Sequence, residues 1–180
     1  MICATFSESM VSMLRSFIRC SFNSYEYVPV GDGAYGNLRI QMNNVPYEIR
    51  NQESPVVMNG EPTDFASFSI VKANNEFEPV CGDQVSLISI EDIVQDILIV
   101  QDAVHLPDGE EILMDMAVVF KTAHTTTMFS RDAWFSEFIT ISDTSDLDAI
   151  YPICRAKDSW RNDDESEVVI RRTTKSLRNK

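Results

Sequence analysis

Two aspartates form the first candidate site in this sequence. Asp102 and Asp115 lie on either side of the turn signal Pro107-Asp108-Gly109, in the strongly apolar stretch 98–122. If Asp108-Gly109 is a two-residue loop, the arms pair as an antiparallel hairpin and Asp102 faces Asp115. Facing carboxylates repel unless they share a proton or a cation. The spacing indicates a carboxylate pair, and the alternative is a bulge or a solvated patch that keeps the two groups apart.

Histidine is the other residue type that suggests acid–base chemistry. His105 precedes the turn and, with Asp102 and Asp115, gives the residues of a hypothetical small enzyme or ligand-binding β-fold. His124 lies in a Thr-rich connection. The chain has no HExxH, Gly-x-Ser-x-Gly or P-loop motif, and its four scattered cysteines lack the spacing of a zinc site. We therefore expect no metal and no cofactor, and the sequence favours a protein that is not an enzyme.

Aromatic residues beside arginine suggest an interaction surface. Trp134 and Phe135 follow Arg131 in a predicted turn between two strands, and Trp160 lies in the polar C-terminal region. Tryptophan and arginine are favoured anchors at protein interfaces. We take these four residues as candidate anchors, and the alternative is that Trp134 and Phe135 close one end of the sheet core.

The charge of the chain is strongly negative and unevenly distributed. The net charge is −13, and residues 32–148 contain 21 acidic and 5 basic residues, a balance of −16. Residues 171–180 contain five basic residues and no acidic one. An acidic body repels phosphates, so direct binding to nucleic acid is not expected. It favours a partner protein with a basic surface, although solubility alone also explains such a balance.

Three function hypotheses follow from these observations. The first is a non-enzymatic acidic interaction protein, an inhibitor or immunity-type module, that binds a basic protein partner. The second is a nucleic-acid mimic whose carboxylates, displayed in rows, inhibit a DNA-binding protein. The third is the small enzyme or ligand-binding β-fold that uses Asp102, Asp115 and His105. Convergence of those three groups in a pocket would support the third hypothesis, and their separation would remove it.

The hydrophobic pattern predicts the elements that position these residues. Both arms of the 98–122 stretch are apolar on both faces, which predicts a buried central hairpin and a four-strand meander over 98–141. Residues 7–20 have a capping box and an apolar stripe at helical spacing. We predict an α+β fold: a twisted, mostly antiparallel sheet of seven to nine strands with this N-terminal amphipathic helix packed on one face. Residues 89–97 fit a helix or a strand equally well.

The chain length predicts one domain over residues 1–170, followed by a flexible basic tail over 171–180. No apolar run approaches the ~20 residues of a membrane-spanning helix, so no membrane association is expected. The N-terminus has no signal-peptide pattern, and scattered cysteines are typical of reduced thiols. We therefore expect a cytoplasmic protein.

Overall fold

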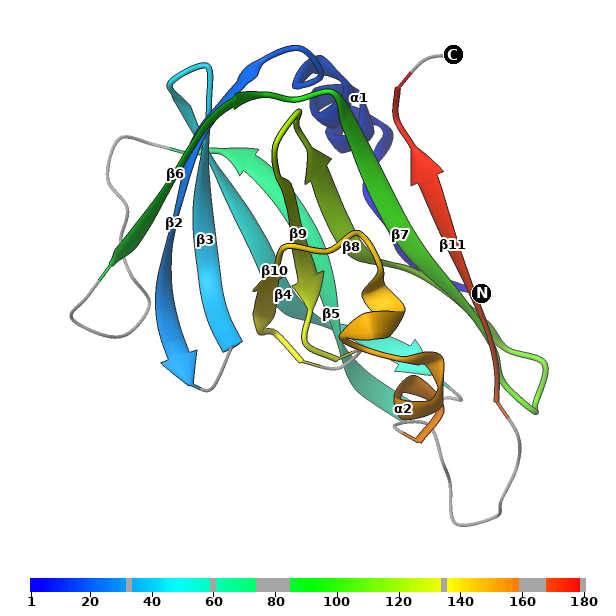
Figure 1. The fold of residues 1–180 in the computed structure, drawn as a ribbon. Coiled ribbons are helices and arrows are strands. Elements are labelled where there is room, and N and C mark those ends of the chain that lie inside the picture. Colours follow the sequence, from blue (N-terminus) through cyan, green and yellow to red (C-terminus); the bar gives the residue numbers. More distant parts are fainter. Residues whose placement is uncertain (32–33, 59–60, 74–84, 134–135, 159–167, 179–180) are drawn as a thin grey trace.

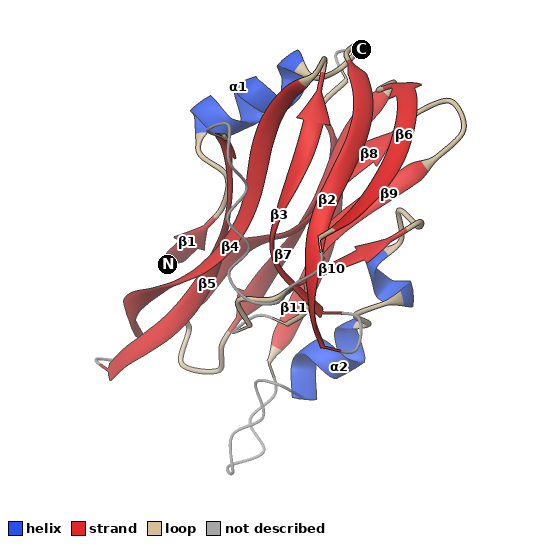
Figure 2. Cartoon of the chain, turned by 90° about the vertical axis from the view of Figure 1, so that its left-hand side faces the viewer, coloured by secondary structure: helices blue, strands red, loops and turns tan. Residues whose placement is uncertain are grey.

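The computed structural model describes residues 1–31, 34–58, 61–73, 85–133, 136–158 and 168–178. In these residues the chain forms one mostly antiparallel sheet that curls into a half-barrel, with few helices (Figures 1 and 2). The strands are β1 (Ile2–Ala4), β2 (Ser21–Gly31), β3 (Ala34–Met42), β4 (Val45–Met58), β5 (Glu61–Lys72), β6 (Ser86–Ile93), β7 (Asp96–His105), β8 (Glu111–Lys121), β9 (Thr126–Arg131), β10 (Ile139–Ser142) and β11 (Val169–Ser176). The helices are α1 (Glu8–Ser16), the 3₁₀ turn η1 (Leu147–Ala149) and α2 (Ile153–Asp158).

The strand order follows a path through β11, β7, β8, β9, β10, β3, β2 and β6. The β4–β5 hairpin joins this path through β3, and β1 pairs parallel to β8. β6 pairs with β2 at one end of the path, and after Val94 and Gln95 the chain continues directly into β7. This short connection joins β6, at one end of the path, to β7, the second strand from the other end, and the sheet is curled (Figure 1).

The predicted central hairpin is confirmed, because β7 and β8 pair antiparallel along their length. Apolar clusters cover both faces of this hairpin. The inner cluster, enclosed by the curl, includes Phe120, Phe129 and Leu14, and the outer cluster includes Val119, Tyr151 and residues near η1 and α2. Burial on both sides explains why the two strands are almost continuously apolar instead of alternating.

The predicted mostly antiparallel sheet is confirmed, but its description as α+β overstates the helices, because the described chain is mostly β. The N-terminal helix is present and shorter than predicted. Ser7 caps α1 by accepting the N–H of Met10, and the helix ends at Ser16. Arg19 then adopts a positive φ of 74° and donates its N–H to Val94 in the bend between β6 and β7, so the helix cannot continue. Figure 1 places α1 at one end of the curled sheet.

The structure decides one region that the sequence left open and corrects another. Residues 89–97 belong to β6 and β7 with a short bend between them, and contain no helix. The predicted flexible tail is wrong for residues 171–176, because β11 pairs with β7 from Val169 to Ser176. Buried Ile170 and Leu177 hold this strand on the outer cluster and the inner cluster, respectively. In the described chain neither α-helix is long and apolar enough to cross a membrane.

Candidate functional site

The loop of the β7–β8 hairpin has three residues instead of two. Leu106 donates its N–H to the carbonyl of Glu110 at 2.9 Å, which leaves Pro107, Asp108 and Gly109 as the loop. Gly109 has a φ of 88°, the left-handed geometry that such loops place at their last position. The extra loop residue shifts the pairing by one position relative to the two-residue prediction.

This shift separates the two aspartates. Asp102 pairs with Met114, and Asp115 pairs with Gln101. Because cross-strand partners share a face and consecutive residues alternate, the two carboxylates lie on opposite faces of the hairpin. The predicted Asp102–Asp115 carboxylate pair is therefore wrong. A β-bulge at Met116 then restores the register of the rest of the hairpin, where Val100 pairs with Ala117.

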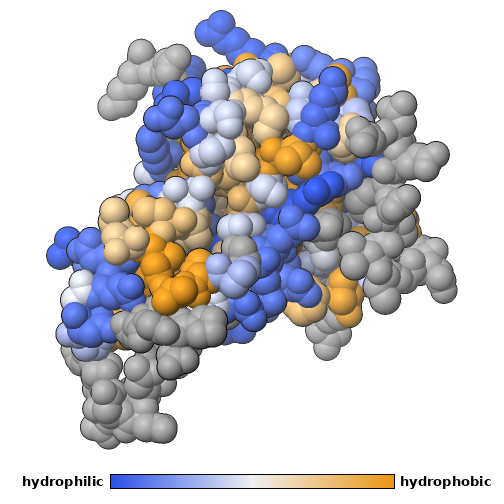
Figure 3. Space-filling view, turned by 180° about the vertical axis from the view of Figure 1, so that it is seen from behind, coloured by the Kyte–Doolittle hydropathy of each residue, from blue (hydrophilic) through white to orange (hydrophobic). Residues whose placement is uncertain are grey.

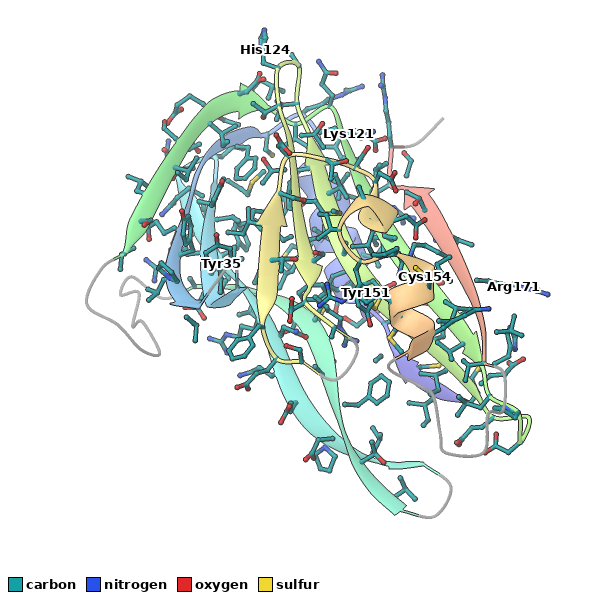
Figure 4. The ribbon with its side chains drawn as sticks, turned by 60° about the horizontal axis from the view of Figure 1, so that its bottom comes forward. Tyr35, Lys121, His124, Tyr151, Cys154 and Arg171 are labelled. Carbon is teal, nitrogen blue, oxygen red and sulfur yellow. The ribbon has the colours of Figure 1, made fainter. Side chains whose placement is uncertain are left out.

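Asp102 lies on the outer face in a complete ion pair with Arg172 of β11. The guanidinium donates Nε to Oδ1 and Nη2 to Oδ2, both at 2.7 Å, and the Asp102 side chain is fully buried. Nη1 of Arg172 also donates to the carbonyl of Tyr151 at 2.6 Å and to Asp148 at 2.9 Å. Burial opposes the charge on Arg172, but the hydrogen bonds and charge of Asp102 raise its pKa. Figure 4 labels Tyr151 near α2, on this side of the sheet.

Asp115 lies on the inner face and is held by neutral donors. Its Oδ2 accepts the backbone N–H of Phe6 at 2.6 Å, and its Oδ1 accepts the side-chain amide of Gln101 at 2.9 Å. Burial raises the pKa of Asp115, and these two hydrogen bonds and the charge of Arg131 counteract it only in part. The carboxylate therefore ties the segment before α1 to the central hairpin.

Arg131 was predicted as an exposed interaction anchor, and this is wrong because the residue is fully buried. Alternation along β9 places it on the same face as Phe129, and its guanidinium contacts one residue of each apolar cluster. Its Nη1 contacts the sulfur of Met114 at 3.5 Å, and its guanidinium carbon lies 5.9 Å from the ring centroid of Phe68. Nε and Nη2 have no hydrogen-bond partner in the described part of the chain. Burial lowers the pKa of Arg131 to about 10, and the charge of Asp115 counteracts this shift.

The other predicted anchors, Trp134, Phe135 and Trp160, lie outside the described residues. Both histidines are described. His105 places Nδ1 3.0 Å from Glu111, its cross-strand partner beside the turn, and His124 places Nδ1 3.0 Å from Asp92. His124 extends from the β8–β9 turn into solvent (Figure 4).

The described residues do not assemble the proposed enzyme site. Asp102 and Asp115 lie on opposite faces. His105 pairs with Glu111, which lies four positions along β8 from Asp115. At the usual rise per residue the backbone positions of Glu111 and Asp115 are roughly 13 Å apart. Across the described chain there is no group of three or more His, Cys, Asp or Glu side chains that could hold a metal ion. Cys3, Cys20 and Cys154 are free thiols.

The structure adds a surface feature that sequence reasoning missed. β6 lies at the end of the strand path, and among the described residues only β2 pairs with it in regular register. It nevertheless exposes large apolar side chains: Leu87 is 62% exposed, Ile93 50% and Ile88 37%. Sheet edges are usually protected by charges, proline or a covering segment. Elsewhere, Figure 3 shows hydrophobic residues on the rear face in separate patches divided by hydrophilic ones.

Hydrogen bonds hold both the bulge and the far end of β6 in place. Glu91 has a positive φ of 49° at a bulge in the β2–β6 pairing, and its carboxylate accepts the side-chain amide of Asn23 at 3.1 Å. Asp92 accepts the backbone N–H of His124 at 3.1 Å. The Thr122 hydroxyl and the backbone N–H of Ile93 hold the pKa of Asp92 below its usual range. The strand is thus fixed in position while its apolar side chains remain exposed.

Comparison of the chain with protein-family models, with curated proteins and with solved structures finds no match.

Proposed function

We propose that this protein is a non-enzymatic interaction protein that captures an extended segment of a basic partner protein along β6. The observation that carries the proposal is the exposure of large apolar side chains on both faces of a strand whose second edge has no partner among the described residues. An extended peptide can add to such an edge through backbone hydrogen bonds, while alternate side chains supply specificity.

The pairing of β6 sets the length of the segment that it can accept. Ser86 to Ser89 pair with β2 in unbroken register, and the bulge at Glu91 ends this regular stretch. Leu87 and Ile88 therefore project to opposite faces within a regular strand, and each can contact an apolar side chain of the added segment. We expect a short partner strand of about four to six residues, typical of strands that pair at an edge.

The negative charge of the chain supports the proposal that the partner is basic. The chain carries −13, and acidic side chains lie beside the apolar ones: Glu26 is the cross-strand partner of Leu87, and Glu91 is exposed on β6 itself. Lysine or arginine residues flanking the apolar positions of the partner would be attracted to these carboxylates. An inhibitor or immunity-type role would follow if the captured segment belongs to the active region of the partner.

The buried charges support a role without catalysis. Asp102 is fully engaged by Arg172, and Asp115 by Phe6 and Gln101, so both carboxylates serve the fold.

Synthetic peptides test the proposal directly. A ten-residue peptide of alternating valine and lysine is titrated into the isotope-labelled protein at low salt, beside the corresponding valine–glutamate peptide. We expect saturable binding of the lysine peptide only, with slower amide hydrogen exchange in β6. Leu87→Lys should weaken binding about tenfold, since it removes an apolar contact and adds a like charge. Added salt should weaken the binding that remains in the native chain.

Val169→Lys is the matched control, because Val169 is 47% exposed on β11, the strand at the other end of the path. This variant should bind as the native chain does. Equal binding of the two peptides, or equal loss in both variants, would contradict capture at β6. Sedimentation of the protein alone provides a further check, because self-association that Leu87→Lys abolishes would identify β6 as a contact between copies instead.

A further inference from the structure

Three arginines line a groove beside the C-terminal end of α1. The groove has a volume of about 700 Å³, and its lining includes Arg15, Arg19 and Arg178 around Ile18, Val94 and Leu177. This volume falls within the range of small-molecule sites. The concentration of positive charge is unexpected in a chain with a net charge of −13.

Backbone contacts between three segments place the arginines around one space. Arg15 lies in the last turn of α1. Arg19 donates its N–H to Val94 at 2.8 Å, and Val94 donates back to Cys20 at 3.0 Å, which joins the chain after α1 to the bend between β6 and β7. The N–H of Arg178 donates to Asp96 at 3.1 Å, immediately after the end of β11. The groove therefore exists only in the folded sheet.

The guanidinium groups of these arginines are available to a ligand. Within the described residues, none of the three takes part in an ion pair. Asp96 is the acid beside Arg178, and both of its oxygens accept the Ser176 hydroxyl, at 2.9 and 2.8 Å, while Oδ1 also accepts the N–H of Ile97. Its carboxylate is therefore engaged by neutral donors.

The backbone at Arg19 is unusual for a residue with a long charged side chain. Its φ of 74° lies in the left-handed region, where a helix usually ends with glycine or asparagine. A long charged side chain at such a position is strained relative to glycine, and strain of this kind gathers at functional sites. The last carbonyls of α1 accept N–H groups from Phe17 and Ile18, which limits the negative potential at this helix end.

We propose that this groove binds a compact anion that carries two or more phosphate groups. Guanidinium groups present paired N–H donors that match phosphate oxygens, and three of them can neutralise a ligand of several charges. The ligand is either a free polyphosphorylated molecule or the head group of a phosphorylated lipid, because the chemistry recognised at the arginines is the same. Ile93 at the end of β6 also lines the groove, but Leu87 and Ile88, where we propose that a peptide binds, do not.

Calorimetric titration at low salt tests the proposal with three probes: tripolyphosphate, citrate, and vesicles that contain phosphatidylinositol bisphosphate. We expect saturable one-to-one binding of tripolyphosphate. Arg15→Gln and Arg19→Gln should each lower its affinity about tenfold or more, as loss of a charged hydrogen bond does. Binding of the vesicles in preference to tripolyphosphate would assign the ligand as a lipid head group. Stronger binding of citrate would overturn the assignment to phosphate.

Two variants separate the site from general effects of charge and folding. Arg171→Gln removes an exposed arginine of β11 that projects away from the sheet (Figure 4), and it should change the affinity less than twofold. Arg19→Gly removes the guanidinium and relieves the left-handed backbone, so the protein should stay folded while the affinity falls as it does in Arg19→Gln. Equal losses in all variants, or no saturable heat with any probe, would overturn the proposal.

Discussion

The two faces of the β7–β8 hairpin each bury one aspartate, and they stabilise it in different ways. Asp102, on the outer face, forms two charged hydrogen bonds with Arg172. Asp115, on the inner face, receives one backbone N–H and one side-chain amide, and burial raises its pKa. The charge of Arg131 also acts on Asp115, and Nε and Nη2 of this arginine have no hydrogen-bond partner in the described chain.

This difference indicates how much each buried aspartate relies on one particular neighbour for its stability. The outer carboxylate forms a bidentate ion pair with a specific arginine, so removal of that arginine leaves a buried carboxylate without its partner. The inner carboxyl group can respond to a change in its surroundings by taking up a proton, which limits the free energy that any one substitution can cost. The outer pair should therefore be the more sensitive of the two to mutation.

The largest effect is expected from Arg172→Met. This change leaves Asp102 buried without its bidentate partner, and it should lower the free energy of unfolding by about 3–5 kcal/mol. Urea denaturation followed by circular dichroism measures the loss. Arg171→Met, at the neighbouring exposed position, should change stability by less than about 0.5 kcal/mol. Similar losses in the two variants would show that the ion pair contributes nothing particular.

A smaller effect is expected from Asp115→Asn. The amide keeps one acceptor oxygen and leaves one of the two donors, Phe6 N–H or Gln101 Nε2, without a partner. The expected loss at pH 7 is about 1–2 kcal/mol, the range for one unsatisfied buried donor. The same denaturation experiment on Asp143→Asn, at an exposed position, should show almost no change. A loss as large as that of Arg172→Met would contradict the contrast between the two faces.

The turn that separates the two aspartates should tolerate substitution at a moderate cost. Gly109→Ala must adopt a φ of 88°, and no neighbouring atom would clash with the added methyl group. Backbone strain alone should therefore destabilise the protein by about 1 kcal/mol. Thermal unfolding measures this cost, and asparagine at the same position should reduce it because asparagine accepts left-handed geometry more readily. Equal melting temperatures for all three chains would show that the loop does not depend on this conformation.

The smallest effect is a dependence on pH. Because the pKa of Asp115 is higher in the folded protein than the ordinary 3.8, the stability that its neutral form contributes is present below pH 3.8 and is lost as the pH rises through the folded pKa. The stability difference between the native chain and Asp115→Asn should therefore be smaller at pH 7 than at pH 4. Denaturation at both values measures it, and a larger difference at pH 7 would show that the folded pKa is lowered instead.

Sequence periodicity was sufficient to locate the hairpin. It was not sufficient to predict the register, that is, which residues of β7 and β8 face each other. The apolar runs and the Pro107-Asp108-Gly109 signal predicted β7 and β8 correctly. The register depended on whether the loop has two or three residues, and a change of one residue moves every side chain to the other face. The bulge at Met116 has no signal in the sequence that would have located it.

The positions of two arginines in the fold were also predicted wrongly from the sequence. Arginine is rarely buried, so Arg131 was expected at the surface, although β9 places it in the interior. Arg172 was assigned to a flexible basic tail because nothing local connects it to Asp102, 70 positions away. The exposed apolar edge of β6 was missed for a similar reason, because exposure depends on which strand has a neighbour and not on the residues of the strand itself.

The pairing of β11 with β7 has a consequence for how the protein is synthesised. During translation, residues 96–121 leave the ribosome well before residues 169–176, so the β7–β8 hairpin can form while Asp102 still lacks its arginine. At that stage water must solvate the carboxylate, and the outer face of the hairpin must stay open. The nascent protein can therefore close this face only after Arg172 has emerged.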